Sequence, residues 1–192
     1  MMLRQIGSAF GMLVVFTLLT GIVYPLAMTG AAQVLFPNQA NGSILIRNGL
    51  QVGSKLIGQN FSSHGYFHGR PSAAGQDGYD ATSSGGSNLG PTNQKLMDTV
   101  TDNIKKVREE NNLADDAKVP SDLVLASGSG LDPHISIEAA YAQIERIARE
   151  RNVSVHEIQK IVEQHMEGRQ WGIFGEFRVN VLELNLALDM LK

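Results

Sequence analysis

The distribution of charged residues divides the chain into an apolar amino-terminal segment and a longer part with ordinary polar spacing. No Asp, Glu, Lys, Arg or His occurs between Arg4 and Arg47. A helix that spans a bilayer needs roughly 20 mostly apolar residues, and most of this gap is Leu, Val, Ile, Phe, Met or a small residue. The pattern predicts a short tip, one transmembrane helix and one domain, over residues 1–5, 6–33 and 34–192 respectively.

Two other interpretations of the apolar segment compete with a retained anchor. A secretory signal has a shorter apolar core of roughly 7–15 residues, but the small residues of 29–32 offer a place where a peptidase could cut. A buried core helix is disfavoured because the segment has no polar face. Within the segment, Pro25 lacks an N–H group and is expected to kink or end the helix.

The charges that flank the segment suggest its orientation. Arg4 and the amino terminus are the charges on the short side, so the positive-inside rule places that side in the cytoplasm and the domain outside. Arg47 and Lys55 on the other side weaken this signal. Gly7 and Gly11 form a G-x-x-x-G pair, which predicts a face where a second membrane helix packs closely.

The remainder of the chain predicts a mixed α/β domain. Short apolar runs at residues 44–46 and 55–57 suit strands between turns. A helical period over residues 92–110 predicts a helix that Thr92 or Asn93 caps and that ends at residues 111–112. Its apolar face consists of Leu96, Val100, Ile104 and Val107.

Three capping residues predict three further helices. Ser136 precedes a helix that buries Ile137, Tyr141, Ile144 and residues 147–148. Ser154 and Glu157 form a capping box before a helix whose apolar face is Val155, Ile158, Ile161 and Val162. Asn180 with Glu183 is placed to cap a last helix, which carries Leu184, Leu188 and Leu191.

Composition narrows the function classes. The formal net charge is −3 and the basic residues are dispersed, which argues against nucleic acid as a partner. Cysteine is absent, so thiol catalysis, disulfides and cysteine-ligated zinc are excluded. The domain is long enough to bury a core of its own.

The chemically suggestive segments are three loops, at residues 65–72, 83–90 and 127–133. Glycine–serine loops before helix N-termini can cradle anions, although tight turns that need positive φ explain the same composition. No G-x-x-x-x-G-K-[S/T] motif is present, so no P-loop lysine is available to hold a phosphate.

We expect neither a catalytic residue nor a metal site. His64 and His68 have the i, i+4 spacing of a metal pair, but the glycines and the proline around them disfavour a helix. Ser127, Asp132 and His134 contain the residue types of a catalytic triad, yet adjacency in the sequence does not create triad geometry.

Six separate strings of unusual composition make the chain resemble a known family. They are Gln39–Ser43, Leu56–Phe61, Gly65–Ser72, Ser84–Leu89, Ser127–Asp132 and Val179–Asp189. With these strings in this order, the chain is similar, nearly end to end, to the C subunit of the bacterial Kdp potassium-transporting P-type ATPase.

This resemblance implies a non-catalytic subunit of a bacterial inner-membrane complex. Its partners would be a potassium-conducting A subunit, an ATP-hydrolysing B subunit and a small F subunit. The resemblance also implies a role in assembly and a role as a catalytic chaperone that raises the ATP affinity of the B subunit. The string Ser84, Gly85, Gly86 and Ser87 is likened in this family to the ABC ATPase signature sequence, which makes these four the candidate nucleotide-binding residues.

The predicted orientation conflicts with direct ATP binding, because it places the serine–glycine loops outside, where there is essentially no ATP. We therefore expect no firmly bound cofactor, with ATP acting through the complex. The alternative is a membrane-anchored nucleotide-binding or enzymatic domain that acts alone. The candidate interface residues, chosen from the family strings, are Tyr66, Phe67, Arg70, Asn88, Asn180 and Asn185.

Overall fold

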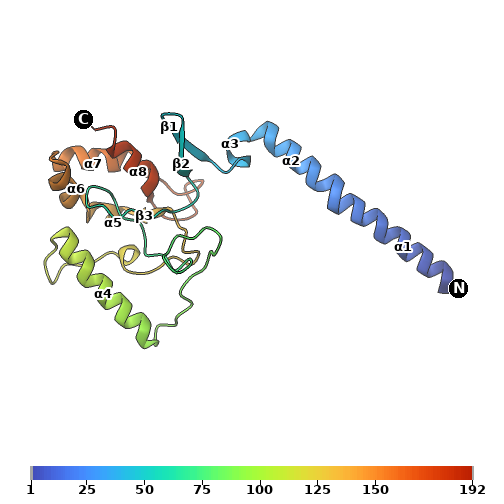
Figure 1. The fold of residues 1–192 in the computed structure, drawn as a ribbon, viewed down its shortest axis with the longest axis horizontal. Helices are drawn as coiled ribbons and strands as arrows, with labels where there is room; N and C mark the ends of the chain where they lie inside the picture. Colours follow the sequence, from blue (N-terminus) through green and yellow to red (C-terminus); the bar gives the residue numbers. More distant parts are fainter. Residues whose placement is uncertain (1, 192) are drawn as a thin grey trace. The chain divides into compact units, whose positions relative to one another are not determined.

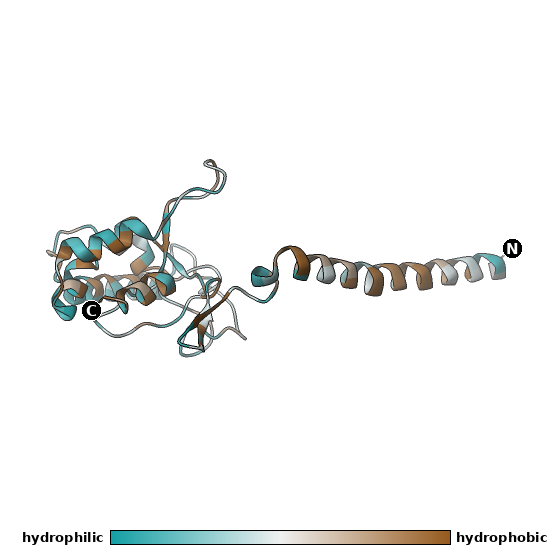
Figure 2. Ribbon diagram, turned by 90° about the horizontal axis from the view of Figure 1, so that it is seen from above, coloured by the Kyte–Doolittle hydropathy of each residue, from teal (hydrophilic) through white to brown (hydrophobic). Residues whose placement is uncertain are grey.

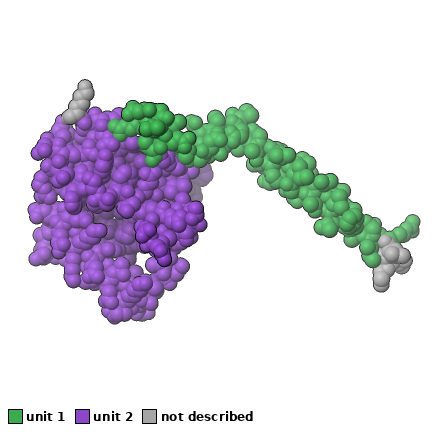
Figure 3. Space-filling model, viewed as in Figure 1, with its two compact units in different colours: residues 1–52 green, residues 53–192 purple. Residues whose placement is uncertain are grey.

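The computed structural model describes residues 2–191, and its side chains are described from Arg4 onward. The chain divides into two compact units, residues 1–52 and 53–192, which are coloured separately in Figure 3. The amino-terminal charge that enters the orientation argument belongs to Met1, which lies outside the described residues. Each unit is described by itself.

The first unit is dominated by a long apolar helix. Figure 1 shows α1 (Met2–Leu18), a π-helical turn η1 (Leu19–Val23) and α2 (Tyr24–Leu35) following one another as one rod. Between residues 2 and 191, this is the one helix long and apolar enough to cross a membrane, with a mean hydropathy of 2.2 over its best window. Apolar residues surround the rod along its middle (Figure 2), and none of that window is buried. The single apolar helix is thus confirmed, and the buried-core alternative is wrong.

Pro25 was expected to kink or end the helix, and the second of these outcomes is wrong. The helical rod continues through Pro25 to Leu35. The π-helical turn η1 lies immediately before α2. Such a turn is a common way to insert an irregularity into a helix without breaking it.

A short hairpin follows the helix. After α3 (Pro37–Ala40), strands β1 (Ile44–Arg47) and β2 (Leu50–Ser54) pair with each other. Asn48 and Gly49 between them both have positive φ, as a two-residue I′ turn requires. The first predicted strand is confirmed. The second, at residues 55–57, is wrong because the strand lies five residues earlier, where the Asn-Gly signal would have placed it.

The second unit combines helices with a small antiparallel sheet. Its elements are α4 (Gln94–Asn111), η2 (Ser121–Leu123), β3 (His134–Ser136), α5 (Ile137–Tyr141), α6 (Ile144–Arg151), α7 (Val155–Gln164), β4 (Met166–Glu167), β5 (Arg178–Asn180) and α8 (Val181–Leu188). Strand β5 is central, with His134 opposite Asn180 on one side and Met166 opposite Val179 on the other. The mixed α/β class is confirmed.

The predicted caps hold with small adjustments. The side chain of Asn93 accepts from the N–H of Lys95 at the start of α4, and Asn112 ends that helix in a left-handed conformation. Ser154 and Glu157 form the complete capping box of α7. Asn180 accepts from the N–H of Glu183 and caps α8.

The helix predicted after Ser136 is in fact two helices. Ser136 caps α5, but the chain turns at Ala142 and Gln143 before α6 begins. Tyr141 is consequently exposed rather than on the buried face, and Val155, at the first position of α7, is exposed as well. The turn places the side chain of Gln143 against the 65–72 loop.

The core of the second unit packs α4, α5, α6, α7 and α8 around the sheet. Ile135, Ile147, Ile158, Val162, Val179, Leu184 and Leu188 are completely or almost completely buried there. One residue from a loop, Phe67, joins them with no exposed surface. The loop that contains Phe67 is therefore fixed to the core.

Candidate functional site

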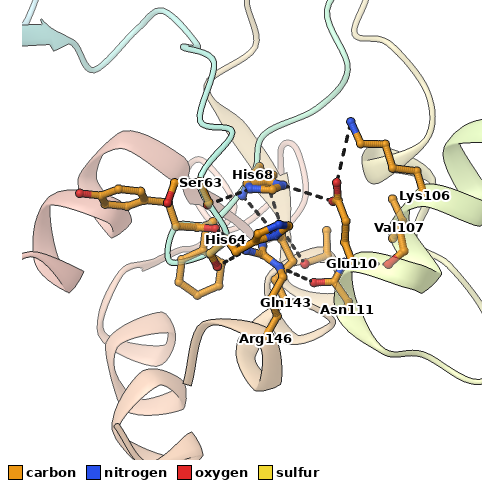
Figure 4. A network of polar contacts seen from close by, with 12 residues as sticks. Ser63, His64, His68, Lys106, Val107, Glu110, Asn111, Gln143 and Arg146 are labelled. Carbon is orange, nitrogen blue, oxygen red and sulfur yellow. Dashed lines mark hydrogen bonds and ion pairs between the residues drawn. The ribbon is translucent and has the colours of Figure 1, made fainter. Parts of the chain in front are cut away.

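The 65–72 loop has no regular secondary structure, and a buried arginine holds it in place. Arg146 is 2% exposed. Its guanidinium donates to the carbonyls of His64 and Tyr66, to Oδ1 of Asn111 at 2.9 Å and to Oε1 of Gln143 at 2.8 Å (Figure 4). Burial lowers the pKa of Arg146 to about 10, so the group stays charged at neutral pH. Carbonyl dipoles compensate this buried charge.

Two amides complete the attachment of the loop. Gln143 accepts from the N–H of His68 at 2.8 Å and donates to the carbonyl of the same residue at 3.1 Å. Asn185 on α8 does the same for Phe67, at 2.8 and 2.9 Å. Each amide replaces the pair of hydrogen bonds that a neighbouring strand would supply.

Arg151 holds the start of the loop against the carboxyl-terminal end of the chain. It donates to the carbonyls of Gly65 and Leu188 and to Oδ1 of Asp189 at 3.0 Å. Its guanidinium also lies over the ring of Tyr66, 4.7 Å from the centroid, and the hydroxyl of Tyr66 donates to the same carboxylate. The ring is thus enclosed by charge on one side and held at its tip.

A cleft of about 280 Å³ lies between this loop and α4. Its polar lining includes Asn60, His68, Arg70, Tyr79, Asn103, Lys106 and Glu110. Both signs of charge are present, so the cleft has no strong preference for an anion or a cation.

His68 joins the two walls of the cleft. Its Nδ1 lies 3.5 Å from Oε2 of Glu110, and Oε1 of the same carboxylate lies 3.8 Å from Nζ of Lys106. Its Nε2 lies 3.1 Å from the carbonyl of Ser63 (Figure 4). Burial, helped by the charge of Arg146, lowers the pKa of His68 below its usual 6.5.

The stability of the second unit is expected to fall as the pH drops below the usual histidine pKa of about 6.5. Because the folded-state pKa of His68 is lowered, the unfolded chain binds a proton in a range where the folded chain does not. The contribution of His68 to the free energy of unfolding is fully present above its pKa in the unfolded chain. It is lost as the pH falls through its pKa in the folded chain. We expect His68→Gln to flatten this dependence. Urea unfolding of the full chain, repeated at several pH values, measures it. His156→Gln, at an exposed position of α7, serves as the control. An unchanged slope in His68→Gln would contradict the assignment.

A chain of charged contacts runs from the loop across the sheet. Arg70 pairs with Asp132 at 3.3 Å, and Asp132 also accepts from the N–H of His134 at 3.0 Å. Burial works against the ionised form, but the bonds from His134 and the charge of Arg70 together lower the pKa of Asp132. Tyr79 donates to the carbonyl of Arg70 at 2.5 Å, and burial, with the charge of Asp132, raises its pKa to about 12.

The same chain of contacts ends on a carboxylate shared by two cations and a histidine. Glu167 accepts from Lys55 at 3.1 Å and from Arg178 at 3.0 Å, and Nε2 of His134 lies 3.6 Å away. Lys55 contacts Glu183 as well, at 2.9 Å, and mainly through this bond its pKa is raised. These contacts link strands β4 and β5 with the beginning of the unit.

This arrangement excludes the triad considered from the sequence. Nε2 of His134 faces the carboxylate of Glu167 rather than the hydroxyl of Ser127. His64 and His68 lie on a loop and not on one helix face. Among residues 2–191, no group of three or more His, Cys, Asp or Glu side chains is arranged to hold a metal ion.

The two serine–glycine loops bind each other. The N–H of Gly85 and the hydroxyl of Ser84 both donate to the carbonyl of Ser129, each at 2.9 Å. Gly130 has φ of 67°, and a Cβ there would lie 2.7 Å from the carbonyl oxygen of Gly85. Gly130 therefore permits a close approach of two backbones, and the tight-turn explanation applies at this position.

Neither loop lies at a helix N-terminus. Helix α4 begins at Gln94, after a further turn, and strand β3 separates the second loop from α5. The helix dipoles therefore do not act on these loops. The nucleotide-binding role of Ser84, Gly85, Gly86 and Ser87 remains a prediction from the resemblance, with Ser84 and Ser87 exposed and the two glycines half-buried.

The candidate interface residues fall into two groups. Phe67, Asn180 and Asn185 are at most 2% exposed, so their side chains support the core and do not present a docking surface. Tyr66 and Arg70 are partly exposed, and Asn88 is exposed with φ of 52°. Gly7 and Gly11 on α1 have open space around them, and their role as a packing face stays a prediction. Sequence reasoning missed Arg146 and Gln143, because nothing local distinguishes a buried polar helix residue from a solvated one.

Asn185→Ala is expected to destabilise the second unit by about 2–3 kcal/mol, because it leaves the buried N–H and carbonyl of Phe67 without partners. Urea unfolding of the full chain in detergent, followed by circular dichroism, measures the change. Asn88→Ala is the control at an exposed position and is expected to stay within about 0.5 kcal/mol. Equal stability of the two variants would refute the role given to Asn185.

Comparison of the sequence with known proteins places the chain in a family. The family model described as "K+-transporting ATPase, c chain" (KdpC) matches residues 6–190. The potassium-transporting ATPase KdpC subunit of Mycobacterium tuberculosis is 54% identical over 190 residues, which cover 99% of this chain and 100% of the relative. The KdpC subunits of Koribacter versatilis and Dechloromonas aromatica are 53% and 52% identical, over 98% and 94% of this chain and 95% and 94% of their own lengths.

Proposed function

The chain belongs to the KdpC family of K+-transporting ATPase subunits, and we propose that it is the single-pass accessory subunit of such a complex in the bacterial inner membrane. Its partners are a potassium-conducting A subunit, an ATP-hydrolysing B subunit and a small F subunit. The amino terminus is cytoplasmic and the domain that follows the helix is outside. The chain supports assembly and, as a catalytic chaperone, raises the ATP affinity of the B subunit.

One observation carries this proposal: the family match includes both the apolar helix and the folded unit. It begins at residue 6, within α1, and runs to residue 190, beyond α8. The apolar segment is thus a family feature and not an addition specific to this chain. A helix without buried charge cannot itself conduct ions, so an accessory role fits the geometry.

The orientation is tested with protease added to sealed, right-side-out membrane vesicles. We expect digestion of the part after Arg47, because that part lies outside in the proposed topology. Vesicles opened with detergent give the full digestion reference. Protection in sealed vesicles would overturn the topology and would favour the alternative of a nucleotide-binding domain that acts alone.

The membrane face of the subunit gives a sharper test. Gly7→Leu and Gly11→Leu are expected to reduce co-purification of the A subunit, because a large side chain prevents close approach of a second helix. Ala9→Leu, on the opposite side of the same helical turn, is the control, since successive residues are rotated by about 100°. Recovery of the complex should be quantified from detergent extracts. Equal recovery with all three variants would mean that this face meets lipid.

The chaperone role is proposed to act through the complex as a coupling free energy and not through direct contact with ATP. In support, the N–H of Gly85 is already bonded to Ser129 and is not available to a phosphate. The test compares the KM for ATP of the complex with and without this subunit, and with Ser87→Ala. We expect removal to raise the KM and the variant to leave it unchanged. A raised KM in Ser87→Ala would instead support direct nucleotide contact.

A further inference from the structure

The segment between β4 and β5, residues 168–177, exposes four large apolar side chains and is called the aromatic tip below. Trp171 is 89% exposed, Ile173 72%, Phe174 59% and Phe177 57%. Single exposed apolar residues are ordinary, but a group this dense marks an interaction surface. The core of the unit does not use these side chains.

The aromatic tip is a built structure and not a loose loop. Gln170 and Phe174 exchange two backbone hydrogen bonds, at 2.8 and 3.0 Å. Arg169 and Glu176 close its base with an ion pair of 2.7 Å. The rings of Trp171 and Phe174 meet edge to face, with centroids 6.0 Å apart.

The backbone conformation of Trp171 is a second observation that favours a functional role. Its φ is 52°, in the left-handed region that a bulky residue rarely adopts. The neighbouring Gly172, with φ of 75°, completes the turn and leaves the indole in solvent. Both the strained backbone and the exposure of a large apolar ring to water cost free energy. Such costs are typical of functional positions.

The charges of the tip indicate what covers it. Its one cation, Arg169, is paired with Glu176, and at its base Arg178 is paired with Glu167, so the tip presents apolar surface without net charge. Exposed Trp and Phe side chains are suited to the boundary between headgroups and acyl chains of a bilayer. A second copy or a soluble partner would not require such a surface to be free of charge.

The distance from the apolar helix makes a bilayer reachable. Residues 36–52 connect the helix to the second unit and span at most about 60 Å when extended. A unit of this size has a radius of gyration of about 14 Å. This length of chain allows the second unit to reach the membrane that the helix spans.

We propose that the aromatic tip inserts Trp171, Ile173 and Phe174 into the interface of the bilayer and forms a second membrane contact of the chain. The proposal rests on the single-pass anchoring proposed above and not on the identity of the partner subunits. It assigns the occupant as lipid, and a partner subunit is the competing occupant that the test distinguishes.

The chain offers a direct probe, because Trp171 is its one tryptophan. We would reconstitute the full chain into phosphatidylcholine vesicles that contain lipids brominated near the headgroup or near the end of the acyl chain. We expect a blue-shifted emission, strong quenching by the shallow bromines, weaker quenching by the deep ones, and protection from aqueous iodide. Because the tip has no net charge, the result should be the same at high salt.

Two variants give this measurement its specificity. Ile173→Ser combined with Phe174→Ser is expected to remove most of the shallow quenching while leaving Trp171 as the reporter. Met97→Ser, which removes an exposed apolar side chain from α4, is the control. In this variant the brominated lipids should quench Trp171 as strongly as in the parent chain.

Retention of the chain in vesicles after alkaline extraction checks the anchor independently. A retained chain whose Trp171 is open to iodide and insensitive to brominated lipid would overturn the proposal while leaving the anchor intact. Protection of Trp171 only after addition of the partner subunits, again without quenching by brominated lipid, would also overturn it and would assign the tip to a protein partner. Loss of the chain on extraction would instead refute the anchoring itself.

Discussion

Replacement of Phe67 by alanine is expected to lower the free energy of unfolding of the second unit by about 3–5 kcal/mol. Phe67 has no exposed surface and packs into the core from a loop with no regular secondary structure. Asn185 fixes its backbone from both sides, so the loop cannot move inward to fill the space that the ring leaves. The loss should therefore include the cost of a cavity as well as the lost burial.

Urea unfolding of the full chain in detergent, followed by far-ultraviolet circular dichroism, measures this change. Phe177→Ala is the matched control, because it removes the same ring from an exposed position. We expect the control to stay within about 0.5 kcal/mol of the parent chain. Comparable losses in both variants would mean that Phe67 is not the core residue described here.

Arg146→Met is expected to cost about 3–4 kcal/mol, because four acceptors lose their donor at once while the apolar stem is preserved. The carbonyls of His64 and Tyr66 and the side chains of Asn111 and Gln143 would then need water or a new arrangement. We expect the 65–72 loop to open first, which hydrogen exchange at its amides would detect.

Arg149→Met on the exposed face of the same helix is the control and is expected to change stability little. Arg146→Lys separates charge from geometry. A lysine keeps the charge but cannot reach several acceptors in a fixed fork, so we expect most of the loss to remain. Full stability in Arg146→Lys would show that the charge alone holds the loop.

The sequence predicted those elements whose signals are local. The uninterrupted apolar run identified the long helix, and the capping residues Asn93, Ser154 and Asn180 fixed the starts of three others. Each of these signals lies within a few residues of the element it defines. The chain between Gly53 and Leu89 gave no such signal, because its structure is imposed by side chains from distant helices.

The candidate site was therefore predicted only in part. The 65–72 loop was selected correctly as an unusual segment, but its composition did not show that Phe67 points inward and Tyr66 toward Arg151. Gln143 illustrates the reason. It lies at the turn between α5 and α6, and its amide binds the backbone of His68, a contact across 75 positions that no local pattern encodes.

The attachment of this loop to the end of the chain also sets the order in which the protein can mature. Phe67 is separated from Asn185 by 118 positions, and Tyr66 from Asp189 by 123. During synthesis the loop therefore emerges long before the helix that completes it, and contacts of such separation form slowly. The second unit cannot close until α8 and Asp189 have been released, so a chain stalled before α8 keeps its core exposed to proteases.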